Sequence, residues 1–347
     1  FVGYSDTSTK DSKVVAIYNG TESVQSANEG DDVTIVLDKT PFYAESGGQI
    51  GDTGTISGSF IFEVTDTTKN EDGHFLHFGT VNRGTVSVGD TVSAEIDVER
   101  RNSIMRNHTT AHILQSSLRA VLGEHVHQAG QLVNQDYCRF DFSHFSAMTS
   151  EEIQKVEDMV NESISRSLQV VIKNMPIEEA RKTGAQALFG EKYGDEVRVV
   201  SMGDFSRELC GGTHVKNTSS IMLFKIVSEA GVAAGVRRIE AITGERVENL
   251  LDTVQDTIND LKSLFNNAPD LMSTVKKAIA ENKELQAQVD EFKAQKAQEF
   301  KKILIEKAQD INGVKVMTAV LPIEAQNAKD IAFQLRGQFP ERLLVAI

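Results

Sequence analysis

Short apolar runs that alternate with polar residues dominate the first hundred positions of the chain. Clusters of Gly, Asn and Asp separate most of them, and the runs predict strands at residues 14–17, 33–36, 60–64, 74–78 and 92–96. A period of two residues places alternate side chains on opposite faces of a sheet. Several short strands joined by turn residues are typical of a small antiparallel barrel, which we expect over residues 1–98.

Helical and strand periods then alternate. A 3.6-residue apolar period predicts a helix over residues 99–123, with Leu114 and Leu118 on its apolar face and Gly123 as its C-terminal cap. A capping box at 149–152 begins a second helix, and residues 177–187 predict a third. Strands are predicted at residues 131–133, 139–142, 169–172, 197–200, 220–227 and 236–242. Helices that cover one face of such a sheet make an α+β domain, expected over residues 99–247.

The remainder of the chain is predicted to be mainly helical and then mixed. Two apolar stripes at helical spacing, interrupted at Pro269, predict a helical hairpin over residues 248–310, which would be either a dimerisation arm or a plain spacer. Residues 311–347 predict a β-α-β unit, the start of a partial α/β domain. Its last apolar run has no following element to bury it, so we expect the chain to be part of a longer protein.

Composition narrows the class of protein. Of the 347 residues, 40% are hydrophobic and 25% charged, as in an ordinary soluble globular protein. We expect a cytoplasmic protein without a membrane span, because there is no long apolar stretch or secretory signal and two cysteines suit a reducing compartment. A net charge of −14 argues against a general nucleic-acid binder. One local cluster of basic residues could still contact RNA or form a solvated helix face: Arg100, Arg101, Arg106 and Arg119.

Three histidines and one cysteine form two pairs with the same spacing. His108 and His112 lie four residues apart, which places both imidazoles on one face of the predicted helix. Cys210 and His214 repeat that spacing around a glycine-containing turn. Three imidazoles and a thiolate suit Zn²⁺, so the four residues are predicted zinc ligands. A metalloprotease is excluded, since its HExxH motif needs a Glu where Thr109 stands.

Several neighbouring residues have two readings. His125 and His127 would share one strand face, as additional ligands or as polar surface residues. Asp204 could orient a ligand imidazole or stabilise a turn. Cys138 has no metal partner in the sequence and is expected to be a small buried side chain. The Gly-rich segment 40–52 matches no phosphate-binding loop and is interpreted as a barrel turn that needs a positive φ at Gly47 or Gly48.

Five motifs in one order identify a family. They are HTTAH at 108–112, RFDFSH at 139–144, ALFGEKY at 187–193, MGDFS at 202–206 and LCGGTH at 209–214. Together they resemble the editing half of bacterial alanyl-tRNA synthetases, and the resemblance covers the chain from about residue 1 to its end. It implies zinc-dependent hydrolysis of mischarged Ser-tRNA(Ala) and Gly-tRNA(Ala), with an ATP-using core that attaches alanine to tRNA(Ala) before residue 1. It also implies that segment 40–52 faces the editing site and that residues after 311 begin a tRNA-binding and oligomerising domain.

Roles for individual residues follow from the resemblance and remain hypotheses. Gln128 matches a position linked to editing, while Gly211, Gly212 and Thr213 would contact the substrate. Arg237 or Arg238 would lie near the phosphate of the terminal adenosine. Four protein ligands close a tetrahedron, so the zinc would be structural, five-coordinate, or loosely held by His112 or His214. The alternative function is a zinc-stabilised module that binds tRNA or oligomerises without catalysis.

Overall fold

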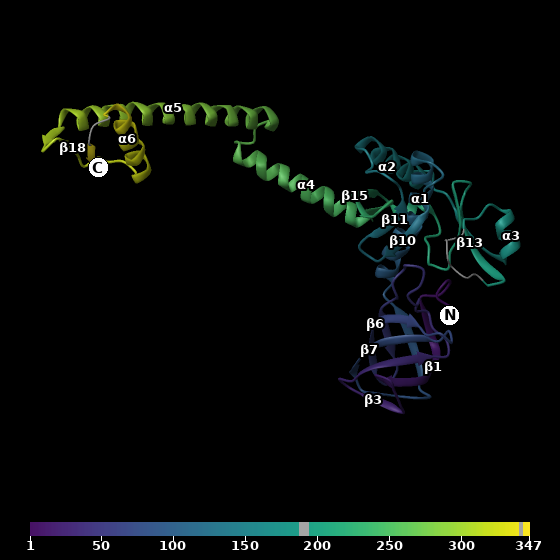
Figure 1. Cartoon of the computed structure of the whole chain (residues 1–347). Helices are drawn as coiled ribbons and strands as arrows, with labels where there is room; N and C mark the ends of the chain where they lie inside the picture. The colour runs from purple at the N-terminus through teal and green to yellow at the C-terminus, as the bar shows by residue number, and fades with distance from the viewer. Residues whose placement is uncertain (187–193, 340–342) are drawn as a thin grey trace. The chain divides into compact units, whose positions relative to one another are not determined.

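The computed structural model describes residues 1–186, 194–339 and 343–347 (Figure 1). The chain divides into two compact units, Phe1–Asp252 and Thr253–Ile347. The first unit contains the barrel and the mixed α+β part, and the second contains most of the helical segment and a small mixed sheet.

The N-terminal part of the first unit is a closed antiparallel barrel of six strands. Its strands are β1 (Ser8–Asn19), β4 (Asp32–Leu37), β7 (Phe75–Arg83), β6 (Ile61–Lys69), β5 (Gly54–Ser57) and β9 (Thr91–Ile96), in that order around the barrel. Pairing of β9 with β1 completes the closure. The predicted barrel is therefore confirmed, because each apolar run identified in the sequence lies on one of these strands or beside it.

Alternation of buried and exposed residues along barrel strands such as β9 fills the interior. In β9 the inward residues Val92, Ala94 and Ile96 are buried while their neighbours are exposed. Phe60 and Phe62 are also fully buried, so aromatic side chains supply much of the core volume. The sequence missed the barrel strand β5, and also the short strands β2 (Glu22–Val24), β3 (Ser26–Asn28) and β8 (Thr85–Ser87), which lie outside the closed ring of six strands. Their few, mostly polar residues give no clear alternation.

Helix α1 (Val98–Leu122) follows the barrel directly. The side chain of Asp97 accepts the N–H of Arg100 at its start, and Gly123 caps its end at φ 115°. Leu114 and Leu118 are fully buried, as the predicted apolar stripe requires. Helix α2 (Ser150–Ser165) packs against α1 and begins at the predicted capping box, in which both reciprocal hydrogen bonds of Thr149 and Glu152 are present.

Two sheets complete this part of the chain. The four-stranded sheet has the order β10 (Gln128–Val133), β11 (Cys138–Ser143), β16 (Val236–Thr243) and β15 (Phe224–Ala233). The three-stranded sheet consists of β12 (Val170–Pro176), β13 (Glu196–Met202) and β14 (Ser206–Leu209). Both α1 and α2 contact the four-stranded sheet, and β14 contacts α1. This arrangement brings the end of β14 to the face of α1 that carries the histidines.

Two sequence predictions need correction here. The strand predicted from residue 220 begins only at Phe224, because Thr218–Ile221 form a 3-10 helix, η1, that Asn217 caps through its side chain. Helix α3 (Ile177–Lys182) ends before the predicted residue 187, and the Thr183 hydroxyl donates to the carbonyl of Ala180. The ALFGEKY motif, residues 187–193, lies outside the described residues.

The second unit has two long helices and a small sheet. Helix α4 (Glu245–Leu264) begins in the first unit, and α5 (Leu271–Glu306) follows the NNAP break. Strand β17 (Gln309–Ile311) pairs with β18 (Val314–Thr318), which pairs in parallel with β19 (Leu343–Ala346). Leu304 at the end of α5 shares a core with Met317 of β18 and with two residues of α6 (Ala325–Gln338).

The apolar stripes of α4 and α5 remain exposed. Leu251 and Val254 of α4 are 56% and 48% exposed, and Leu285 and Phe292 of α5 are 59% and 60% exposed. A hairpin in which the two stripes pack on one another is therefore not seen among the described residues. No helix in the described part of the chain has both the length and the apolar character needed to cross a bilayer.

Candidate metal centre and cavity

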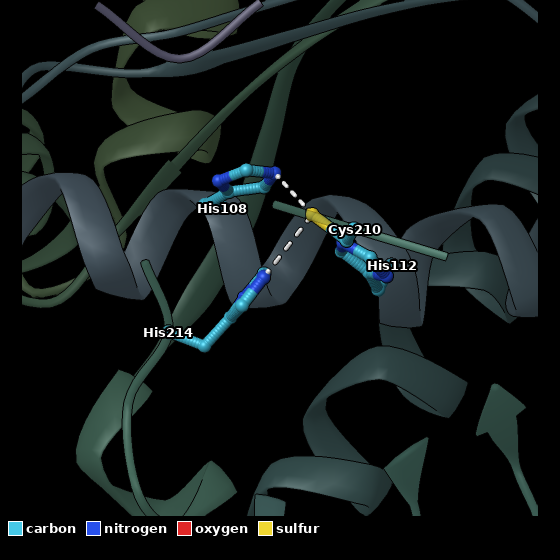
Figure 2. A group of neighbouring side chains, drawn as sticks. All are labelled: His108, His112, Cys210 and His214. Carbon is cyan, nitrogen blue, oxygen red and sulfur yellow. Dashed lines mark hydrogen bonds between the residues drawn. The ribbon is translucent and has the colours of Figure 1, made fainter. Parts of the chain in front are cut away.

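Four side chains converge between α1 and the segment that follows β14 (Figure 2). His108 and His112 extend from one face of α1, and Cys210 and His214 come from the glycine-containing turn. Their ligand atoms all lie within 4.8 Å of one another. The three histidines are buried, so the structure brings the two sequence-distant pairs into one enclosed cluster.

The thiol of Cys210 is at the centre of this cluster. Its Sγ lies 3.4 Å from Nε2 of His108 and 3.4 Å from Nε2 of His214, and it accepts the N–H of Gly212. Burial raises the pKa of Cys210, but the nearby imidazoles outweigh burial and hold that pKa well below its ordinary value. Burial lowers the pKa of His214 to about 3. A thiolate beside a neutral imidazole is the protonation state in which both residues bind a metal.

His108 and His214 also have a hydrogen-bonding partner on the other ring nitrogen. Nδ1 of His108 lies 2.7 Å from Oε1 of Gln49, and Nδ1 of His214 lies 3.3 Å from the hydroxyl of Thr109. Such partners fix ring orientation in metal sites. Together with the buried N₃S donor set, they make the cluster fit a zinc ion.

The carboxylate beside His112 is Glu208, not Asp204. Nδ1 of His112 lies 2.9 Å from Oε2 of Glu208. Burial lowers the pKa of His112, but the charges of Glu208 and Cys210 raise it to about 10 overall. Asp204 is fully exposed and, among the described residues, its one ion-pair partner is Arg207, at 3.9 Å. Of the two readings of Asp204, orientation of a ligand imidazole is therefore wrong.

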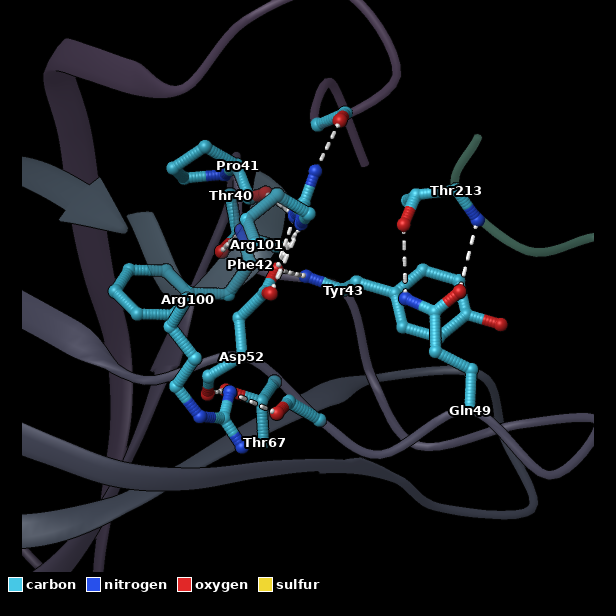
Figure 3. A network of polar contacts seen from close by, with 12 residues as sticks. Thr40, Pro41, Phe42, Tyr43, Gln49, Asp52, Thr67, Arg100, Arg101 and Thr213 are labelled. Atoms are coloured by element: carbon cyan, nitrogen blue, oxygen red, sulfur yellow. Dashed lines mark hydrogen bonds and ion pairs between the residues drawn. The ribbon is translucent and has the colours of Figure 1, made fainter. Parts of the chain in front are cut away.

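The Gly-rich segment between β4 and β5 is both a turn and a part of this site. Gly47 and Gly48 have φ values of 59° and 81°, so the predicted need for positive φ is confirmed. The sequence did not single out the next residue, Gln49, although it is fully buried. Its side chain contacts Thr213 (Figure 3) and also His108. Nothing in residue spacing marks a glutamine on a loop as buried, and only the resemblance pointed the segment toward the site.

A buried ion pair anchors the same segment to α1. Arg101 donates to both carboxylate oxygens of Asp52 and to the carbonyls of Gly3 and Pro41 (Figure 3). Asp52 also accepts the backbone N–H of Tyr43. Both predicted roles of Arg101, on a solvated helix face or in an RNA-binding patch, are therefore wrong, because its side chain is 3% exposed.

Two other arginines of the predicted basic cluster also donate hydrogen bonds to backbone carbonyls. Arg100 donates to the carbonyl of Gly51, and Arg119 donates to the carbonyls of Glu124 and Val126. These two side chains hold loops against the two ends of α1.

The turn between Cys210 and His214 is held by Arg198. Nη1 of Arg198 donates to the carbonyls of Cys210 and Gly212, and its guanidinium lies 4.2 Å from the ring centroid of Tyr4. The Tyr4 hydroxyl donates to the carbonyl of Gly211. A cavity of about 290 Å³ opens beside this turn. Its lining includes Tyr43, Ser46, Gly47, His108, Gln131, Arg198, Cys210, Gly211 and Gly212.

Other residues singled out in the sequence lie away from the cluster. Gln128 begins β10 and is half-buried, and the glutamine of β10 that lines the cavity is Gln131. Arg237 makes a two-bond ion pair with Glu229. Arg238 pairs in the same way with Asp141.

His125 and His127 are not part of the four-residue cluster. His125 instead lies 2.9 Å from a nitrogen of His144 and stacks on that ring. The prediction that these two histidines are additional ligands is therefore wrong. Both lie in the turn between the end of α1 and the start of β10 at Gln128, and not on the strand face that the prediction assumed. Cys138 is fully buried as expected, and burial raises the pKa of its thiol to about 12.

Comparison with known proteins gives the class of protein first. Residues 1–100 match the family described as tRNA synthetases class II (A), and residues 197–240 match the threonyl and alanyl tRNA synthetase second additional domain. The second match contains Cys210 and His214. The barrel and half of the cluster thus correspond to parts of class II aminoacyl-tRNA synthetases.

The full-length relatives are alanine–tRNA ligases. The chain is 51% identical over 311 residues to the enzyme of Bacteroides fragilis (strain YCH46) and 49% identical over 321 residues to that of Acetivibrio thermocellus. The relative from Bacillus velezensis is 45% identical over 336 residues. These alignments cover 89%, 92% and 95% of this chain but only 35%, 36% and 37% of the relatives. The chain is therefore homologous to alanine–tRNA ligases and spans about a third of their length.

Proposed function

We propose that this chain hydrolyses the ester that joins serine or glycine to tRNA(Ala) and spares alanyl-tRNA(Ala). One observation carries the proposal: the buried cluster of three histidines and a cysteine borders an open cavity through His108 and Cys210. A binding pocket distinguishes amino acids that differ by one small group by only about 1–3 kcal/mol. A ligase for alanine therefore benefits from a second site that removes serine and glycine.

The residues divide into a metal-holding set and a substrate-contacting set. His108, His112, Cys210 and His214 would hold a zinc ion, which when bound supplies a positive charge that polarises a carbonyl oxygen or acidifies water. Separate contacts to the substrate are proposed for Gly211, Gly212 and Thr213, which form the turn beside the cavity.

Gln128 remains a proposed catalytic residue and Arg237 a proposed contact to RNA phosphate. Gln128 would have to act from the edge of the site, since it is not among the residues that line the cavity. Arg237 would have to exchange Glu229 for the phosphate. We further propose that the whole protein, like relatives named alanine–tRNA ligases, joins alanine to tRNA(Ala) with ATP and works in the cytoplasm.

Deacylation assays test the proposed function. The chain is incubated with Ser-tRNA(Ala), Gly-tRNA(Ala) and Ala-tRNA(Ala), and release of the amino acid is measured. We expect hydrolysis of the first two only, and loss of both hydrolysis and zinc in Cys210→Ala. Cys138→Ala is the matched control, because this thiol is buried away from the cluster. Absence of hydrolysis by the zinc-loaded parent, or full activity of zinc-free Cys210→Ala, would refute the proposal.

Gln128→Ala tests the catalytic role of that residue separately. We expect slower hydrolysis of Ser-tRNA(Ala) at unchanged zinc content, because Gln128 makes no contact with the four clustered side chains in the described hydrogen-bond network. An unchanged rate removes Gln128 from the proposal.

The exposed helices favour a second candidate function, a zinc-stabilised tRNA-binding or oligomerisation module. Apolar stripes that are exposed along α4 and α5 are the kind of surface through which helices self-associate. Light scattering of the chain with and without residues 248–347 tests this. A higher mass only for the longer chain supports a homo-oligomer formed through the arm and C-terminal domain, and equal protomer numbers refute it.

A further inference from the structure

We propose that Gln49 is a positioning residue of the metal centre: from the barrel side, it holds His108 in one tautomer and orients the hydroxyl of Thr213. The first part concerns only the metal site. The second part, on Thr213, rests on the proposed function. The barrel loop then orients a ligand of a site whose four candidate ligands all come from the following α+β part.

The contacts of Gln49 determine which way its amide faces. Its Oε1 lies 2.9 Å from the backbone nitrogen of Thr213, and a backbone N–H can only donate. The atom at that position must therefore be the oxygen, so the orientation of the amide follows from the network itself.

That orientation determines the tautomer of His108. The same Oε1 lies 2.7 Å from Nδ1 of His108, so Nδ1 must carry the hydrogen. A neutral His108 then has a bare Nε2, and this nitrogen lies 3.4 Å from Sγ of Cys210 inside the cluster. Gln49 thus presents the nitrogen lone pair of His108 to the point where a metal ion would be held.

The other end of the amide orients Thr213. Nε2 of Gln49 donates to Oγ1 of Thr213 at 2.9 Å, so this hydroxyl accepts from Gln49. Within residues 1–186, 194–339 and 343–347 no acceptor is found for the hydrogen of the Thr213 hydroxyl. Thr213 and His214 both line a second cavity of about 510 Å³. On the proposed function, the substrate is the acceptor for this hydrogen.

The backbone around Gln49 is held on both sides. The carbonyl of Gly48 accepts the N–H of Val133 on β10, and Ile50 donates to the carbonyl of Val133. A Cβ atom on Gly48 would lie 2.5 Å from Cγ of Gln131, so no larger residue fits there. The loop is therefore seated against β10, which gives Gln49 the fixed position that a positioning residue needs.

Two variants of Gln49 and one matched control test the inference. Gln49→Met keeps the approximate volume and removes every hydrogen bond of the amide. Gln49→Glu keeps an acceptor for His108 and Thr213 but removes the donor, so the Thr213 hydroxyl must donate to the carboxylate. The control is Gln131→Met, because Gln131 lines the first cavity and donates to Gly47 of the same loop without contacting the cluster.

Zinc affinity is measured by competition with a chromophoric chelator, and the ligand field by the visible spectrum of the Co²⁺ form. We expect zinc affinity to fall about 10- to 100-fold in Gln49→Met, the range found for lost partners of ligand histidines, and to stay within a few-fold of the parent in Gln131→Met. Gln49→Glu should keep the affinity and the Co²⁺ spectrum of the parent but show a lower kcat on Ser-tRNA(Ala).

Parent-like zinc affinity in Gln49→Met, or an equal loss in Gln131→Met, overturns the inference. If Gln49→Met does not fold, Gln49→Glu decides, and loss of its metal or of the parental Co²⁺ spectrum overturns the inference. A parent that binds zinc but does not hydrolyse Ser-tRNA(Ala) refutes the proposed function instead and leaves the metal measurements standing.

Discussion

Gly212 passes directly against the imidazole of His108. A Cβ atom at Gly212 would overlap the His108 ring and lie 2.9 Å from Oε1 of Gln49. The φ of Gly212 is not in the left-handed region, so the requirement for glycine here is steric. The close approach is what allows Cys210, two residues earlier, to face a histidine on the neighbouring helix.

Gly212→Ala should weaken zinc binding at least 10-fold and destabilise the protein by about 1–3 kcal/mol, the usual cost of overpacking. The methyl group would push His108 away from Cys210. Gly211→Ala is the matched control for both measurements, because the nearest atom to its added Cβ is the Tyr4 hydroxyl oxygen at 4.0 Å. Chelator competition and urea denaturation measure the two effects. Equal zinc affinity in the two variants would contradict this steric account.

Glu208→Gln should lower zinc affinity by about 10- to 100-fold, because Glu208 is the partner of Nδ1 in His112. Asp204→Asn, four residues earlier, should leave the affinity unchanged, since Asp204 is exposed and its carboxylate lies beside Arg207. Both are measured by metal competition. A loss in Asp204→Asn of the size found for Glu208→Gln would show that net charge, not this contact, determines the affinity.

Arg101→Met should destabilise the zinc-loaded chain by about 3–5 kcal/mol, because it leaves the buried carboxylate of Asp52 without its partner. Lys39→Met is the control. It removes the ion pair with Asp11 on the surface, where solvent screens the interaction, and little change is expected. Urea denaturation followed by circular dichroism gives both values. A similar, small effect in both variants would mean that the buried pair does not anchor the barrel loop.

The barrel should lose stability as the pH falls below about 6.5. His77 is fully buried between the hydroxyl of Thr40 and the carbonyl of Ile35, and burial lowers its pKa to about 4. Between pH 6.5 and 4 the unfolded chain takes up a proton that the folded chain does not, so this contribution is present above pH 6.5 and is lost progressively down to pH 4. Across this pH range the titration of His77 lowers the free energy of unfolding by about 3 kcal/mol.

Urea denaturation of the parent and of His77→Gln across this pH range measures the difference. The free energy of unfolding should depend more steeply on pH in the parent than in His77→Gln, since glutamine does not titrate. His74→Gln, which changes an exposed histidine before the same strand, should retain the slope of the parent. A slope in His77→Gln that equals that of the parent would contradict the assignment.

Much of the barrel and of the ligand set could be predicted because both depend on local spacing. A two-residue period determines which side of a strand is apolar, and a separation of four places His108 and His112 on one helix face. Cysteine and histidine are rare in this chain, so two matched pairs stand out against the rest of the sequence. The resemblance to alanyl-tRNA synthetases added an expected chemistry, which stays a prediction, and the similarity to alanine–tRNA ligases confirms the family.

The partners of those ligands could not be predicted, because they come from distant parts of the chain. Gln49 and His108 are 59 positions apart, and Arg101 and Asp52 are 49 apart. Neither pair has a periodic signal. From the sequence alone, a charged side chain such as that of Arg101 is expected at the surface. It is buried because the barrel loop packs over α1. The same limit explains why the sequence points to Asp204, and not to Glu208, as a partner of a ligand imidazole.

The sequence alone therefore determined the local elements and the four residues of the candidate metal cluster, since these follow from short-range geometry and from the chemistry of the donor atoms. The tertiary structure decided which groups orient those donors, because a hydrogen bond between two loops depends on how separately folded parts are placed against one another. In the folded chain, Gln49 of the barrel loop accepts the hydrogen of Nδ1 in His108, although nothing in the sequence of this loop marks Gln49 as a buried residue.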